Sequence, residues 1–419
     1  MLRRIFSTYR EAFSGVPRAV WLLSVASLVN RSGTMVLTFL TLFLTQERSF
    51  TTAQAGQALA VFGVGGVAGS YLGGWLCDKI GARSVMGASL VLTGLGFLVL
   101  EHLRTRGAIL LMLLALSLVA EAFRPANSAA IAAASTREGQ AKSFALYRLA
   151  INLGMTLGPA IGGFLAVYDY GWLFRVDGAT CLLAAGLLWF SFRKDVRTVR
   201  DASATAGAPE RSPWRDAPFL LMMGLMFLLA LITFQMVSTF PLTLRDLYGF
   251  AESRIGLVLA INTLIIVVFE MVLVHSLRER DPMKVVAIGG FLFGLGLALL
   301  PFGRGFLYAA FTVAVWTMGE MLTLPVLSGV VANRAGEANR GLYMGLFVLS
   351  FEGAFVLAPL TGTWVYQRFG PMTLWLACGV VGVVLWIGFW ALSGVFRRET
   401  LTPRPPLPSA LPSPGRGGD

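Results

Sequence analysis

The chain has 419 residues, of which 56% are hydrophobic and only 13% are charged. Soluble globular domains carry roughly 25% charged residues, so this composition excludes an ordinary soluble domain and indicates a protein surrounded by lipid. The net charge of +12 does not indicate a nucleic-acid partner, because the basic residues gather in short loops and tails and do not form one basic domain.

Apolar stretches of the length that crosses a bilayer, about 20 residues, recur along the whole chain. The first follows a polar stretch and lacks an A-x-A-like cleavage site, so we expect a retained helix and not a secretory signal. Twelve spans are predicted, near residues 18–45, 55–76, 85–101, 108–132, 143–167, 174–192, 218–243, 253–275, 285–302, 306–332, 342–366 and 372–394.

The polar segments between these spans predict the domain organisation. Residues 193–217 form the longest polar interruption and are rich in charge, Ala, Pro and Ser, which is typical of a linker. We therefore expect an all-α membrane protein with two six-helix bundles. Its predicted parts are an N-terminal tail (1–17), a first bundle (18–192), a linker (193–217), a second bundle (218–396) and a disordered, Pro-rich tail (397–419).

The charge distribution predicts the orientation. An even number of spans puts both termini on one side, and the loops and tails of that side hold most of the Lys and Arg residues. Cytoplasmic loops carry such an excess, so we expect both termini in the cytoplasm. The short loops and the absence of large soluble domains favour a bacterial inner membrane.

Few residues suggest catalytic or metal-binding chemistry. Cys77 lies at a predicted helix end and Cys181 and Cys378 lie in separate spans, while His102 and His275 have no second ligand at a suitable spacing. No nucleophile-plus-base pattern, phosphate loop or dinucleotide fingerprint is evident. We expect no metal, no cofactor and no enzymatic activity.

A shift of about 200 residues superposes features of the two halves. Glu121 corresponds to Glu320, each in the fourth span of its half and each followed by a proline, Pro125 or Pro325. Further matches are Tyr147 with Tyr343, Asn152 with Glu352, and Gly158-Pro159 with Ala358-Pro359. This ordered series predicts two parallel repeats with a substrate path between them near the bilayer midplane.

The loop between spans 2 and 3 carries the sequence Gly74-Trp75-Leu76-Cys77-Asp78-Lys79-Ile80-Gly81-Ala82-Arg83. Together with the twelve-span organisation, it resembles the major facilitator superfamily, over residues 18 to 396. The resemblance implies alternating access between two halves, usually as a monomer. It also implies a cytoplasmic gating loop, formed here by Gly74, Asp78, Gly81 and Arg83, that holds the outward-facing arrangement, with Glu138 as a partner for Arg83. The corresponding loop of the second half lacks the glycines.

Span 5 contains the run Gly154, Gly158, Pro159, Gly162 and Gly163. Glycines at i, i+4 and i+8 make a flat helical face for close packing, and the proline bends the helix. Simple small-residue packing between helices is the alternative explanation. The run is similar to the signature of the twelve-span drug:proton antiporters in the superfamily, which implies export.

Ionisable residues at membrane depth are costly and usually face a polar path or pair with each other. The proton-coupling candidates are Glu121, Glu320 and Glu352, and any of them can instead be a structural ion-pair partner. Asp177, Glu270 and Arg148 are expected in gate or structural pairs, and Glu121 is expected to pair with Arg124 or Arg31. The substrate-cavity candidates are Asn30, Arg31, Arg124, Gln235 and Trp316.

These observations favour a secondary transporter that exports hydrophobic or amphipathic small molecules in exchange for protons. Arg31 stands where many relatives carry an acid, and together with Arg124 it suits an anionic substrate. Two alternatives therefore remain open: a proton-coupled or facilitative transporter of a small metabolite or organic anion, and a transport-dead sensor on the same scaffold. The expected partners are a small-molecule substrate, protons and the bilayer, with no nucleic acid.

Overall fold

A computed structural model of the chain describes residues 15–32, 34–136, 139–191, 212–277, 280–334 and 340–401. The tail 397–419 was predicted to be disordered, but residues 397–401 are helical, which corrects the start of the tail. Its remainder from residue 402, most of the predicted linker 193–217, and Glu138 lie outside the described residues.

Helices long and apolar enough to cross a membrane number twelve, and no strand occurs within the described ranges. This confirms the predicted all-α class. The elements are α2 (Arg18–Ser32), α3 (Met35–Glu47), α4 (Thr52–Ile80), α5 (Ala82–His102), α6 (Arg106–Ala120), α7 (Phe123–Ala134), α8 (Gln140–Tyr168), α9 (Gly171–Ser191), η1 (Pro213–Arg215), α10 (Ala217–Thr233), α11 (Gln235–Asp246), α12 (Glu252–Ser276), α13 (Pro282–Ala298), η2 (Leu300–Phe302), α14 (Phe306–Arg334), α15 (Arg340–Phe369) and α16 (Pro371–Leu401).

Three spans that we expected to be continuous are interrupted. Span 1 consists of α2 and α3, span 4 of α6 and α7, and span 7 of α10 and α11. In span 4 the break precedes Pro125, which lies in the first turn of α7, where a proline costs no helical hydrogen bond. Pro325, its counterpart in the repeat, lies inside the unbroken α14.

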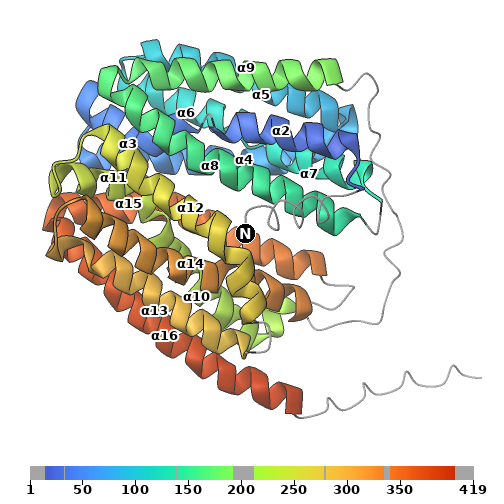
Figure 1. Cartoon of the computed structure of the whole chain (residues 1–419), viewed down its shortest axis with the longest axis vertical. Coiled ribbons are helices and arrows are strands. Elements are labelled where there is room, and N and C mark those ends of the chain that lie inside the picture. Colours follow the sequence, from blue (N-terminus) through green and yellow to red (C-terminus); the bar gives the residue numbers. More distant parts are fainter. Residues whose placement is uncertain are drawn as a thin grey trace, which may run out of the picture.

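The helices form two bundles, one from α2 to α9 and one from α10 to α16, which lie one above the other in Figure 1. We name the two ends of the molecule after the glycines that turn the chain there with positive φ. The Gly81 end (φ 86°) carries the start of α2 and the end of α16, and the Gly370 end (φ 85°) lies to the left in Figure 1. The bundles converge at the Gly370 end and diverge towards the Gly81 end.

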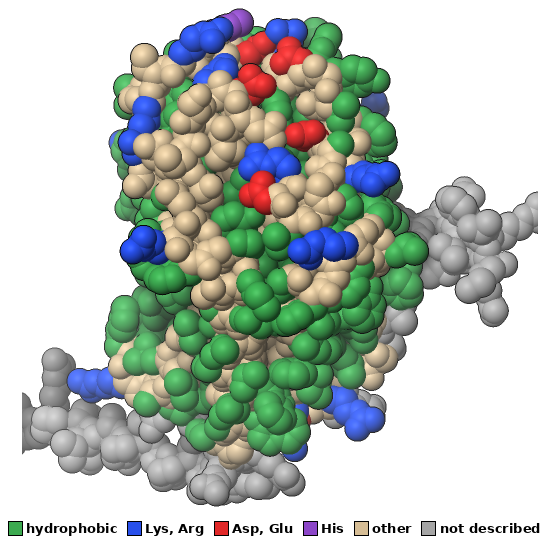
Figure 2. Space-filling view, turned by 90° about the vertical axis from the view of Figure 1, so that its left-hand side faces the viewer, with side chains coloured by type: hydrophobic (Ala, Val, Ile, Leu, Met, Phe, Trp, Pro, Cys, Tyr) green, Lys and Arg blue, Asp and Glu red, His purple; other side chains and the backbone are tan. Residues whose placement is uncertain are grey.

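Hydrogen bonds between the bundles close the Gly370 end. The Tyr170 hydroxyl donates to Glu252 at 2.7 Å, and the Ala53 amide donates to the Gln367 side chain at 2.8 Å. Weaker bonds join Gln46 to Glu252 and Arg245 to Thr45. Figure 2 looks onto this end, where acidic and basic side chains lie close together over the upper part of the face.

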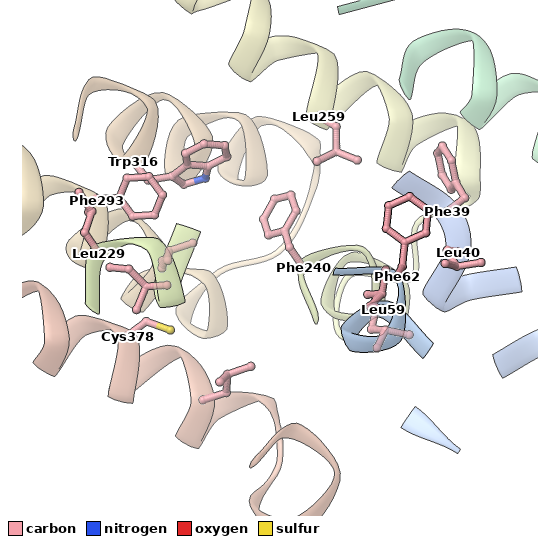
Figure 3. Close-up of a cluster of buried hydrophobic side chains, with 14 of the residues drawn as sticks. Phe39, Leu40, Leu59, Phe62, Leu229, Phe240, Leu259, Phe293, Trp316 and Cys378 are labelled. Carbon is pink, nitrogen blue, oxygen red and sulfur yellow. The ribbon is translucent and has the colours of Figure 1, made fainter. Parts of the chain in front are cut away.

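The apolar core is continuous across the two bundles. One cluster of buried side chains includes Phe39 and Phe62 from the first bundle and Phe240, Phe293 and Trp316 from the second. In Figure 3, Phe240 lies between the group around Trp316 and the group around Phe39. The two halves therefore share a packed apolar contact in this conformation.

Candidate functional site

Arg124 joins acidic residues of both bundles. Its Nη1 lies 3.4 Å from Glu121 Oε2, at the end of α6, and 3.4 Å from Glu352 Oε1 on α15. The guanidinium side chain is 51% exposed, whereas Glu121 and Glu352 are 20% and 29% exposed. The predicted Glu121–Arg124 pair is therefore present, and Glu352 extends it across the bundle interface.

A cavity of about 400 Å³ adjoins this cluster. It lies between α4, α7 and α15, so both bundles contribute to its wall. It is lined by Val67, Ser70, Arg124, Pro125, Ser128, Gly345, Val348, Leu349 and Glu352. An apolar wall with a few charged groups suits an amphipathic ligand.

A second set of ionisable residues lies along α8, α12 and α14. Arg148 forms an ion pair with Glu270 across the bundle interface. Glu320 accepts a hydrogen bond from Asn262 Nδ2 at 2.9 Å, and the same amide donates to Thr317 Oγ1 at 3.1 Å. Within the described ranges Glu320 has no basic residue within 4 Å.

The three proton-coupling candidates thus have different surroundings. Glu121 and Glu352 share one arginine, while Glu320 is bonded to an uncharged amide. Although Glu121 and Glu320 are related by the repeat, they do not belong to one cluster. The sequence places them in equivalent spans, but their partners come from neighbouring helices that differ between the halves.

Of the five predicted cavity residues, Arg124 lines this cavity, whereas Asn30, Arg31, Gln235 and Trp316 do not, which corrects their assignment. Trp316 is fully buried against Phe293 and Phe240 in the core of the second bundle. Gln235 is buried at the break of span 7, where its amide donates to the Ala358 carbonyl at 2.9 Å. Their side chains are large and lie in mostly apolar spans, a pattern that core and cavity residues share.

The residues at the end of α2 take different positions. The Asn30 amide contacts the Cys181 sulfur on α9 at 3.5 Å, inside the first bundle. Arg31 is partly buried, and it has no carboxylate within 4 Å among the residues that the structure describes. Of the two alternative partners predicted for Glu121, Arg124 forms the ion pair and Arg31 does not.

The predicted gating loop lies at the Gly81 end. Gly81 has a φ of 86° and its amide closes α4 by donating to the Cys77 carbonyl at 3.1 Å. Asp78 is exposed, and no ion pair joins it to Arg83, although both residues are described. Arg83 instead donates to the Trp189 carbonyl at 3.3 Å. The predicted partner Glu138 lies outside the described residues.

The glycine and proline run of α8 has two packing faces. Gly154, Gly158 and Gly162 face the junction of α2 and α3: a Cβ on Gly154 would lie 2.7 Å from Arg31 Cβ, and one on Gly162 would lie 2.8 Å from Met35 Cβ. Gly163 and the Pro159 carbonyl face Gly256 on α12 of the other bundle. The run therefore packs within its own bundle and also across the bundle interface.

Asp177 is a residue whose role the sequence did not predict. We expected it in a gate or a structural pair, but its carboxyl group accepts hydrogen bonds from the backbone amides of Met35 and Val36. It is fully buried. The small and polar residues Ser32-Gly33-Thr34 inside span 1 could have indicated a break in the helix. A helix that begins at such a break needs a capping partner.

Comparison with known proteins agrees with this architecture. Residues 20–352 match the Major Facilitator Superfamily. The uncharacterized MFS-type transporter YttB of Bacillus subtilis is 25% identical over 369 residues, covering 86% of this chain and 92% of that protein. The solved structure of the nucleoside transporter NupG superposes with a TM-score of 0.78 at 14% identity, covering 90% of this chain and all of that one.

Two further relatives are named for an activity. A Na(+), Li(+), K(+)/H(+) antiporter of Planococcus maritimus is 23% identical over 399 residues, covering 87% of this chain and 91% of that protein. The multidrug resistance protein MdtH of Cronobacter sakazakii is 22% identical over 325 residues, covering 76% and 80%. The fold, the interface between the bundles and the family match define an integral membrane transporter. The chain belongs to the Major Facilitator Superfamily.

Proposed function

We propose that this transporter exports hydrophobic or amphipathic small molecules in exchange for protons, with Glu320 as the first proton-coupling residue. The observation that carries the proposal is the setting of Glu320, which is bonded to Asn262 and has no basic partner within 4 Å in the described chain. A carboxyl group without a basic partner can take up a proton without breaking an ion pair. Glu121 and Glu352 share Arg124 and rank second.

The same proposal assigns a conformational state to the structure. Bonds between the bundles close the Gly370 end, while Asp78 in the predicted gating loop has no ion-pair partner among the described residues. If this loop stabilises the opposite, outward-facing arrangement, its unpaired Asp78 fits a conformation that is closed at the Gly370 end. The proposed orientation puts the Gly81 end in the cytoplasm of a bacterial cell, where the protein works as a monomer with protons and a small-molecule substrate as partners.

Proton movement in proteoliposomes that contain a pH dye tests the proposal, with a panel of lipophilic cations, neutral drugs and organic anions. We expect substrate-dependent proton flux that Glu320→Gln abolishes. Glu101→Gln is the matched control, because Glu101 pairs with Arg175 inside one bundle, away from the cavity. Substrate movement without proton flux would instead indicate a facilitator and leave Glu320 a structural role.

One observation favours a second function, the transport of an organic anion. Arg31 has no ion-pair partner in the described chain, and Arg124 faces the cavity while half-exposed. Uptake of organic anions that is lost in Arg31→Gln, with no response to lipophilic cations, would favour this function over drug export.

A further inference from the structure

The break in span 1 creates a problem that the bilayer makes severe. The first amides of a helix have no partner within that helix, and no water reaches them in the hydrocarbon region. α3 begins at Met35 inside the span, and its cap residue Thr34 makes no side-chain hydrogen bond to the helix amides. These amides therefore need a partner from elsewhere in the fold.

Asp177 of α9 supplies that partner. Its Oδ1 accepts from the Met35 amide at 3.2 Å, and its Oδ2 accepts from the Val36 amide at 2.8 Å. A carboxylate at a helix N-terminus is also favoured by the helix dipole. Because Asp177 is fully buried, water cannot replace it.

The junction that Asp177 holds is also the surface on which α8 packs. A Cβ on Gly154 would lie 2.7 Å from Arg31 Cβ and 2.9 Å from the Leu28 carbonyl, so α8 and α2 are in direct contact. One turn further, Gly158 faces the carbonyls of Arg31 and Ser32. The position of α8 therefore depends on the position of the junction.

The other face of α8 meets the second bundle. A Cβ on Gly163 would lie 3.0 Å from Gly256 Cα on α12 and would also overlap the Glu252 carbonyl. The Glu252 side chain accepts a hydrogen bond from the Tyr170 hydroxyl, and this bond helps to close the Gly370 end. A continuous series of contacts thus joins Asp177 to the closure between the bundles.

We propose that Asp177 is a positioning residue of the transport cycle: by capping α3 it fixes the junction in span 1 and, through α8, the closure of the Gly370 end. The role of this closure in transport rests on the proposed function, in which the protein works by alternating access. The closure itself is measured without substrate or proton gradient, so its test does not depend on the proposed proton antiport.

The test combines two measurements on Asp177→Asn in detergent and in nanodiscs. Hydrogen exchange of the peptide covering residues 34–40 reports on the cap. Spin labels at Arg104→Cys and Arg304→Cys, exposed loop positions of the two bundles at the Gly370 end, report on the closure in a background with the three native cysteines changed to Ser. An amide has only one acceptor oxygen and its NH₂ opposes the second backbone N–H, so we expect exchange about tenfold faster or more at the start of α3. The label distances should shift to longer values.

Asp281→Asn is the matched control. Asp281 also caps a helix, accepting from Met283 N at 3.0 Å, but it lies at the Gly81 end inside one bundle. The Asp281→Asn variant should show faster exchange only at the start of α13, and its label distances should be unchanged. If Asp177→Asn does not fold, Gly154→Ala tests the same junction from α8 and should also lengthen the label distances.

Three results would overturn the proposal. Unchanged exchange at residues 34–40 would mean that Asp177 does not hold the start of α3. Faster exchange with unchanged label distances in Asp177→Asn, or the same lengthening in Asp281→Asn, would limit Asp177 to an ordinary structural cap.

Discussion

Arg148 of α8 and Glu270 of α12 form an ion pair between the bundles in which the carboxylate is the buried partner: the side chains are 59% and 10% exposed, respectively. Reversing either charge would leave like charges facing each other across the interface. We expect Arg148→Glu and Glu270→Arg each to slow transport, and the double exchange to recover much of the loss, because directly contacting residues are coupled. A double variant as slow as the product of the two single effects would show that the two residues do not act as a pair in the cycle.

Gly163 lies at a close approach of α8 and α12, since an added Cβ would overlap Glu252 and Gly256. We expect Gly163→Ala to push the bundles apart at the Gly370 end, at a cost of about 1–3 kcal/mol for overpacking. Spin-label distances between the bundles measure the displacement. Gly186→Ala is the matched control, because an added Cβ there has no atom within 4 Å. Equal behaviour of the two variants would argue against a close seal at Gly163.

The glycine face towards span 1 permits a graded test at Gly158. An added Cβ would lie 3.3 Å from the Ser32 carbonyl and 3.4 Å from Thr34 Oγ1, so alanine needs only a small adjustment, whereas leucine does not fit. We expect Gly158→Ala to retain most of the transport rate and Gly158→Leu to lose it or to leak protons. Full proton coupling in Gly158→Leu would reduce the run to ordinary helix packing.

Asp216 precedes α10 outside the membrane span and forms a buried cluster with Arg334 of α14. Burial acts to raise the pKa of Asp216, but hydrogen bonds from Arg334, at 2.6 and 2.7 Å, together with the arginine charge, outweigh it and hold the pKa below its ordinary value. The folded pKa is thus lower than the unfolded pKa of about 3.9. The cluster stabilises the fold above that unfolded pKa, and the contribution is lost as the pH falls through the folded pKa.

We therefore expect Asp216→Asn to lower the melting temperature at neutral pH and to differ less from the unmodified chain in acid. Asparagine still caps α10, so this variant removes the carboxylate charge, and with it the ion pair and the bond from the Tyr343 hydroxyl, but keeps the cap. Breaking a buried pair costs about 3–5 kcal/mol. Arg175→Gln, which breaks the more exposed pair with Glu101, should have a much smaller effect. A melting difference for Asp216→Asn that is independent of pH would contradict the assigned ion pair.

The gating-loop assignment is tested at Asp78, which is exposed in this conformation. If the loop stabilises the opposite, outward-facing state, Asp78→Asn should slow transport while membrane insertion and the melting temperature change little. Unchanged turnover would remove the assignment.

The sequence predicted the spans because apolar length alone determines them, and it predicted the Glu121–Arg124 pair as one of two alternatives because residues three apart can share a helical face. It did not predict the breaks in spans 1, 4 and 7, because the apolar length of each span was read as one continuous helix, although Ser32-Gly33-Thr34 and Pro125 lie at or next to two of the breaks. Nor did it predict the cap at Asp177, whose partners are more than 140 residues away in the chain. Trp316 was misassigned because composition does not distinguish the side of a helix that faces a cavity from the side that packs in the core.

The contacts between the bundles differ in their response to salt. At the Gly370 end they are hydrogen bonds in which at least one partner is uncharged, whereas Arg124–Glu352 and Arg148–Glu270 pair full charges with a half-exposed arginine. Ions screen exposed charge pairs over about 8–10 Å at physiological ionic strength. The equilibrium between the conformations that open at one end or the other should therefore depend on the salt concentration on the Gly81 side much more than on that on the Gly370 side. This asymmetry between the two compartments requires no gradient of substrate.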